Sequence, residues 1–129
     1  MDETDSSSRF PHEKLAVWQD ARRLVRTVYA ITRTFPKSEA FGLTSQLNRA
    51  VVSVACNLAE GSARTSARDQ SHFSQLAYSS LMEVSCLLTL SADLDLIAAD
   101  PQQQMQGEIR ILSARIHKLR QAQINRIAT

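Results

Sequence analysis

The chain has 129 residues, of which 43% are hydrophobic and 5% aromatic, and it contains only three glycines and three prolines. This length suffices for one domain with a buried core, and so few turn-forming residues argue against a fold of many short strands. The formal net charge of +2 excludes a chain that is basic or acidic as a whole. No run reaches the roughly 18 apolar residues that predict a membrane span.

The first residues, MDETDSSSR, are polar and show no periodicity. They predict a disordered tail over residues 1–9, followed by one folded domain over 10–129. An acidic beginning lacks the basic and apolar regions of a signal peptide, so we expect a cytoplasmic protein with no membrane partner. The two cysteines, Cys56 and Cys86, form no Cys-x-x-Cys pair, and we expect them to be reduced, buried thiols.

Apolar residues recur at alternating steps of three and four in four segments. This period is typical of helices that turn one face toward a core, and it predicts helices at about 12–35, 44–60, 66–97 and 101–127. Because the connections are short, neighbouring helices should run in opposite directions. The sequence therefore predicts an all-α fold, an antiparallel up-down-up-down four-helix bundle.

Local signals mark the ends of these helices. Pro36 should end the first, because the residue before a proline avoids helical backbone angles. Thr44 and Ser66 are candidate N-caps of the second and third helices, and Asp100 that of the fourth, where Pro101 follows. Gly61 should end the second helix, since glycine adopts the left-handed conformation without penalty.

The second helix carries a polar edge beside its apolar stripe. Its members are Gln46, Arg49, Ser53, Asn57 and Glu60. Such residues can fix how helices dock and assemble, can be plainly solvated, or can form a ligand or catalytic site, and we favour the first interpretation. The second and third helices also carry apolar residues away from their main stripes, which predicts self-association. These are Val52, Ala55, Cys56, Ala59, Tyr78, Met82, Cys86 and Leu90.

Charge is segregated along the chain. Residues 9–37 carry seven bases against two acids, residues 38–104 three against seven, and residues 105–129 five against one. The first and last helices should be neighbours, so their cations would lie on one side and could meet phosphates. An ordinary solvated face is the alternative, and few aromatics remain to stack on bases. The candidate nucleic-acid-binding residues are Arg22, Arg26, Arg33, Lys37, Arg110, Arg115, Lys118 and Arg126.

No arrangement of residues points to catalysis. The three histidines, His12, His72 and His117, fall in different helices without a His-Glu-x-x-His pattern, and there is neither a glycine-rich phosphate loop nor a Gly-x-Ser-x-Gly elbow. Only the pair Asn57 and Glu60 leaves a minor alternative for an enzyme site. We expect no metal, cofactor, catalytic residue or small-molecule substrate.

Several segments together resemble a known family. The patterns are WQ-x-A at 18–21, VY at 28–29, FP-x-x-E-x-FGL at 35–43, QL-x-RA at 46–50 and N-x-AEG at 57–61. This combination resembles the bacterial four-helix bundle proteins encoded in intervening sequences of 23S ribosomal RNA genes. It is similar, more distantly, to the accessory variability proteins of retroelements, which are pentameric and thought to bind nucleic acid.

The resemblance implies a pentameric bundle without established enzymatic activity. Asn48 and Cys56 depart from the residues usual in the family at those positions, and the first departure argues against RNA contact by this helix. We therefore expect a non-enzymatic homo-oligomer, most simply a pentamer, that binds structured RNA or other nucleic acid through basic faces. The alternative is a structural or protein-interaction module that binds no nucleic acid.

Overall fold

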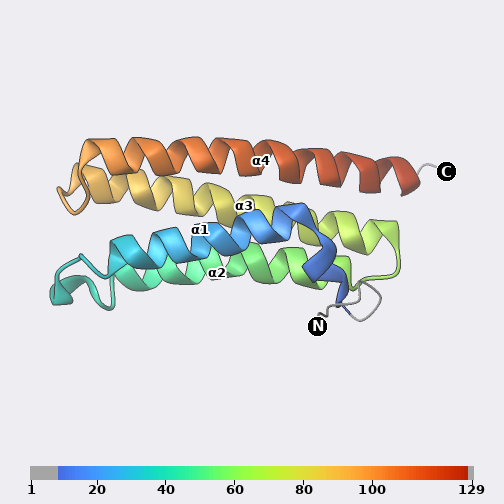
Figure 1. Cartoon of the computed structure of the whole chain (residues 1–129), viewed down its shortest axis with the longest axis horizontal. Helices are drawn as coiled ribbons and strands as arrows, with labels where there is room; N and C mark the ends of the chain where they lie inside the picture. Colours follow the sequence, from blue (N-terminus) through green and yellow to red (C-terminus); the bar gives the residue numbers. More distant parts are fainter. Residues whose placement is uncertain (1–8, 128–129) are drawn as a thin grey trace, which may run out of the picture.

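The computed structural model describes residues 9–127, so the N-terminal segment expected to be disordered lies, apart from Arg9, outside the described residues. The main elements are the helices α1 (Ala16–Thr32), α2 (Leu43–Ser62), α3 (Ala67–Asp93) and α4 (Ala99–Ile127). Two short 3-10 helices, η2 (Pro11–Lys14) and η3 (Lys37–Glu39), flank α1. Figure 1 shows successive helices running in opposite directions along one long bundle. The all-α prediction is confirmed, and residues 9–127 contain no strand.

The first helix is shorter than predicted. Leu15 has extended backbone angles (φ −87°, ψ 121°), and its N–H donates to the carbonyl of His12, so η2 and α1 are separate helices. The Glu13 carboxylate accepts the N–H of Phe10 at 2.7 Å, which closes the short N-terminal turn on itself. At the other end, α1 stops at Thr32, three residues before Phe35.

Both predicted ends of α2 are wrong. The helix begins at Leu43 rather than after Thr44, and the Glu39 side chain accepts the Leu43 N–H at 3.2 Å. Gly61 lies buried inside the helix and has no positive φ. Its role is to let α3 approach, since a Cβ at this position would lie 2.9 Å from the Phe73 Cβ.

The predicted start of α3 is confirmed, because the Ser66 hydroxyl accepts the Asp69 N–H at 3.1 Å. The helix ends at Asp93, earlier than expected, and Asp95 turns the chain with a φ of 59°. Helix α4 then begins at Ala99, which places Asp100 in its first turn rather than at the N-cap.

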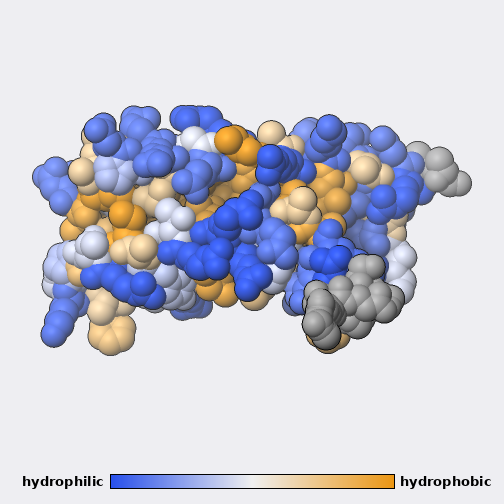
Figure 2. All heavy atoms as spheres, in the orientation of Figure 1, coloured by the Kyte–Doolittle hydropathy of each residue, from blue (hydrophilic) through white to orange (hydrophobic). Residues whose placement is uncertain are grey.

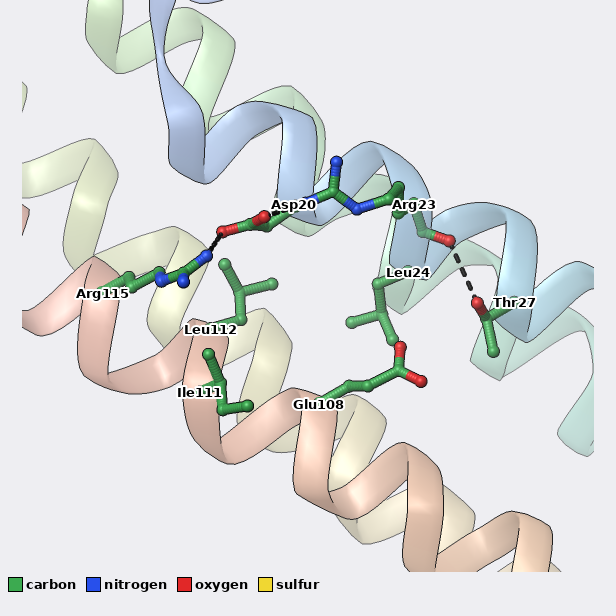
Figure 3. A pocket seen from close by; sticks show the side chains of 8 residues that line it. All are labelled: Asp20, Arg23, Leu24, Thr27, Glu108, Ile111, Leu112 and Arg115. Carbon is green, nitrogen blue, oxygen red and sulfur yellow. Dashed lines mark hydrogen bonds and ion pairs between the residues drawn. The ribbon is translucent and has the colours of Figure 1, made fainter.

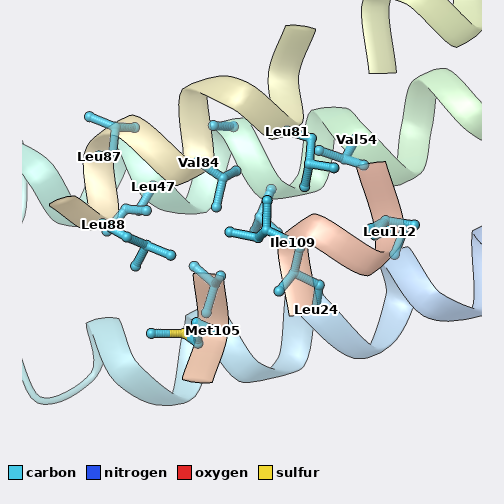
Figure 4. Close-up of a cluster of buried hydrophobic side chains, with 14 of the residues drawn as sticks. Leu24, Leu47, Val54, Leu81, Val84, Leu87, Leu88, Met105, Ile109 and Leu112 are labelled. Carbon is cyan, nitrogen blue, oxygen red and sulfur yellow. The ribbon is translucent and has the colours of Figure 1, made fainter. Parts of the chain in front are cut away.

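The core is one continuous apolar cluster drawn from all four helices (Figure 4). Its largest fully buried side chains are Leu47, Leu81, Leu88, Ile109 and Ile116. Helix α3 packs extensively against both α2 and α4, whereas α1 and α4 contact each other sparsely. The bundle is therefore tightly closed on three sides and loosely closed along the seam between α1 and α4.

The apolar residues that lie off the main stripes divide into two groups. Ala55, Tyr78 and Met82 pack against the core of the same chain. Leu90, by contrast, is 44% exposed, and both cysteines are exposed. The expectation of buried thiols was wrong, because Cys56 and Cys86 fall on the outer sides of α2 and α3 rather than on their core stripes.

Buried polar pairs join the helices at fixed registers. The Ser74 hydroxyl donates to Gln123 Oε1 at 2.7 Å, and the Ser85 hydroxyl donates to Gln106 Oε1 at 2.6 Å. Both glutamines belong to α4 and both serines to α3. Gln123, which interrupts the apolar stripe of α4, is thus buried against a polar partner, and sliding α4 along α3 would break both pairs.

Replacing Ser74 with alanine should destabilise the fold by about 1–3 kcal/mol, because Gln123 Oε1 would be buried without its donor. Urea denaturation measures this change. The double variant Ser74→Ala/Gln123→Leu should recover most of the loss, since neither polar partner remains. Ser113→Ala is the matched control, because that hydroxyl bonds only to the Arg110 carbonyl at the exposed surface. Equal stabilities of Ser74→Ala and Ser113→Ala would contradict the interpretation.

Candidate nucleic-acid interface

The cations of α1 form an outward row on one side of the helix. Arg22 lies over the Trp18 ring, with its guanidinium carbon 5.6 Å from the ring centroid, and donates to Gln19 at 3.5 Å. The side chains of Arg26 and Arg33 are exposed and make no hydrogen bond or ion pair with any residue between 9 and 127. Three guanidinium groups on this row therefore lack a carboxylate partner. Lys37 lies beyond α1, in η3, and is exposed.

The four candidate cations of α4 point to different neighbours. The side chains of Arg110 and Lys118 are exposed and have no polar partner within the described range. Arg115 forms an ion pair with Asp20 of α1, and Arg126 donates to Gln70 of α3 at 2.6 Å. Only part of the α4 set is thus available to an outside anion.

A groove runs between α1 and α4, where the two helices pack loosely. Its deeper part has a volume of about 450 Å³ and an apolar floor of Leu24 and Leu112 (Figure 3). The Asp20 carboxylate lies at one end of this part and pairs with both Arg23 and Arg115.

The groove continues along the same seam toward the α3–α4 turn. This second part, of about 550 Å³, shares Thr27 and Glu108 with the first. It is lined by Arg26, Ala30, Ile31, Pro101, Gln104 and Met105 besides the shared residues. Figure 2 shows orange hydrophobic residues between hydrophilic ones along this seam. The structure thus places Asp20, Glu108 and an apolar channel between the cations of α1 and those of α4. The two rows of cations therefore do not form one continuous basic surface.

The polar edge of α2 separates into three parts. The Ser53 and Ser80 hydroxyls lie 2.8 Å apart and join α2 to α3, while the Asn57 amide donates back to the Ser53 carbonyl at 2.9 Å. Glu60 pairs with Arg64 at 3.2 Å, at the end of the helix.

Gln46 and Arg49 have a different environment. They are exposed and line a shallow depression with Phe41 and Glu83. Neither Arg49 nor Glu83 has a polar partner within residues 9–127. This part of the edge faces away from the chain's own core and is open to a partner.

Two features of the surface were not anticipated from the sequence. Asp20 pairs with Arg115, 95 positions away in the sequence. Only its second pair, with Arg23 three residues on, could be predicted from the local sequence. Phe41, which the apolar composition of its segment would assign to the interior, is 100% exposed.

Two other features, a metal-binding cluster and a membrane-spanning helix, are absent from the described part of the chain. No group of three or more His, Cys, Asp or Glu side chains converges there in a way that could hold a metal ion. None of the described helices is long and apolar enough to cross a membrane.

Comparison with known proteins gives the family. No curated protein matches the chain. The family model described as 23S rRNA-intervening sequence protein matches residues 13–118, which is most of the bundle. The match runs from η2 through more than half of α4, and it includes every segment of the sequence patterns noted above. The chain therefore belongs to the 23S rRNA-intervening sequence protein family.

Proposed function

We propose that this protein is a non-enzymatic homo-oligomer, most simply a pentamer, that binds structured RNA or other nucleic acid through the outward cations of α1 and α4. The observation that carries the proposal is the absence of carboxylate partners, within residues 9–127, for five exposed cations. These are Arg22 and Arg26 on α1, Arg33 directly after it, and Arg110 and Lys118 on α4. Unpaired, exposed guanidinium and ammonium groups are the usual ligands of backbone phosphates.

Self-association would increase the number of cations that face a bound nucleic acid. One copy presents only a few unpaired cations, but a ring of several copies presents them repeatedly, which raises the overall affinity through effective concentration. Exposed large apolar side chains support association, because a monomer gains nothing from leaving them in water. Phe41, Leu94 and Ile111 are among the most exposed of the described residues.

The binding mode should depend on salt and only weakly on base sequence. Fluorescence anisotropy with a labelled RNA hairpin, at about 50 and 200 mM salt, measures both affinity and its salt slope. The triple variant Arg22→Gln/Arg26→Gln/Arg33→Gln should weaken binding about tenfold or more at the lower salt and flatten the slope. The control is Arg64→Gln/Arg68→Gln, which removes cations near the α2–α3 turn and should keep most of the affinity.

Binding without any salt slope, or no binding at the lower salt, would exclude phosphate contact. The alternative function, a protein-interaction module, would then be favoured, because the groove between α1 and α4 is amphipathic rather than basic. The triple arginine variant should leave such a protein interaction unchanged. Sedimentation equilibrium tests the oligomer separately, and a mass of one chain, 14.4 kDa, would overturn it.

A further inference from the structure

A ring of identical subunits needs two different surfaces on each copy, one that is inserted and one that receives. Its application to this protein rests on the self-association proposed above. The structure carries a candidate for each surface, on opposite sides of the bundle. One is the tip formed by Phe41 beside α2 and α3, and the other is the groove between α1 and α4.

The inserting surface centres on Phe41. This side chain is 100% exposed at the turn between η3 and α2, and Arg49 and Glu83 lie beside it around one shallow depression. Burying a phenylalanine removes about 150–250 Å² of surface from water, so leaving it fully exposed is unfavourable in an isolated chain. Phe41 thus forms an apolar knob, and one cation, Arg49, and one anion, Glu83, lie next to it.

The receiving surface is the outer part of the groove. It has a volume of about 550 Å³ and apolar walls that include Ala30, Ile31 and Met105. Arg26 on α1 and Glu108 on α4 flank it, and neither has a polar partner among the described residues. The groove therefore offers an apolar hole with one cation and one anion beside it.

We infer that Phe41 of one copy inserts into the groove between α1 and α4 of the next copy. The charges are complementary, because Arg49 and Glu83 beside the knob match Glu108 and Arg26 beside the hole. Each of these four groups would gain a partner of opposite sign that it lacks among residues 9–127. Phe41 cannot reach its own groove, which lies on the other side of the bundle.

The two surfaces lie toward the same end of the bundle, on different sides of it. The turn that carries Phe41, the C-terminal end of α1 and the start of α4 all lie at the same end of the bundle (Figure 1). Because both surfaces lie toward this end, two copies can meet with their bundles side by side. A head-to-tail contact of this kind gives a closed ring when the rotation from one copy to the next is a whole fraction of a full turn.

Light scattering and sedimentation velocity test the inference on the intact protein. Phe41→Asp should convert the oligomer to monomer, with an unchanged circular dichroism spectrum because the side chain is fully exposed. Phe10→Asp is the matched control, since Phe10 is also a largely exposed phenylalanine, 68% exposed, but lies away from both surfaces. The control should remain oligomeric.

Charge reversal tests the pairing across the contact. Arg49→Glu and Glu108→Arg should each weaken assembly, and the double variant should restore it, because the ion pair reforms with its signs exchanged. Two single losses without restoration would contradict this pairing.

Mixing two defective variants tests whether the contact is head-to-tail. Ala30→Arg fills the hole but leaves the knob, and Phe41→Asp removes the knob but leaves the hole. Each variant alone should be monomeric, and their mixture should form a complex of two chains and no larger. Assembly of either variant alone would overturn the inference.

The outcomes separate this inference from the proposed function. A monomeric wild-type protein would overturn both. An oligomeric wild type whose size does not change in Phe41→Asp would overturn the knob-and-groove contact alone and leave self-association standing.

Discussion

Replacing Gly61 with alanine is expected to destabilise the protein by about 1–3 kcal/mol. The added Cβ would lie 2.9 Å from the Phe73 Cβ and 3.5 Å from the Gln70 carbonyl oxygen. A Cβ cannot move without its backbone, so the overlap must be relieved by separating α2 from α3. Those two helices form one of the largest interfaces of the bundle, and the cost extends beyond one contact. Urea denaturation at a fixed protein concentration measures the change.

Gly107 provides the matched control. It also lies within a helix, but a Cβ added there would meet nothing within 4 Å. Gly107→Ala should therefore stabilise the protein by about 0.5–1 kcal/mol, because alanine loses less backbone entropy in a helix than glycine. The two substitutions are chemically identical, so a difference in sign isolates the close approach of α3. Stabilisation by both would show that α2 and α3 can separate without cost.

The helices could be predicted from the sequence because their signal is periodic and repeated. A stripe such as Leu47, Val51, Val54 and Leu58 specifies both the helix and its buried face, and the structure buries all four. The cap at Ser66 was also predictable, since its hydrogen bond spans only three residues. These features depend on residues that are neighbours in the sequence.

The missed features depend on residues that are distant in the sequence. The role of Gly61 is set by Phe73 on the next helix, so its local pattern was mistaken for a helix end. The Asp20–Arg115 pair joins residues 95 positions apart, and no local rule identifies it. The full exposure of Phe41 depends on how the α1–α2 connection leaves the bundle. The candidate site was thus predicted as a list of cations, but the amphipathic groove between α1 and α4 and the exposed Phe41 required the three-dimensional arrangement.

Replacing Leu81 with alanine should have the largest effect of a single core substitution, a loss of about 2–5 kcal/mol. Leu81 is fully buried on α3, and the core around it includes Val54 of α2 and Ile109 of α4 (Figure 4). Removing its isobutyl group loses the hydrophobic transfer energy and leaves a cavity that three helices would have to close together. The serine–glutamine pairs hold α3 and α4 in register, and the Ser53–Ser80 hydrogen bond joins α2 to α3. We therefore expect little relaxation and a cost in the upper half of that range.

Leu90→Ala is the control for this loss, since Leu90 belongs to the same helix but is 44% exposed. Its effect should stay within about 0.5 kcal/mol. Both variants must be compared at the same protein concentration, because self-association would add a concentration-dependent term to the apparent stability. Measuring each at two concentrations separates the contributions. The Leu81 loss should be the same at both concentrations if the core belongs to one chain, and a loss that vanished on dilution would place Leu81 in a contact between copies instead.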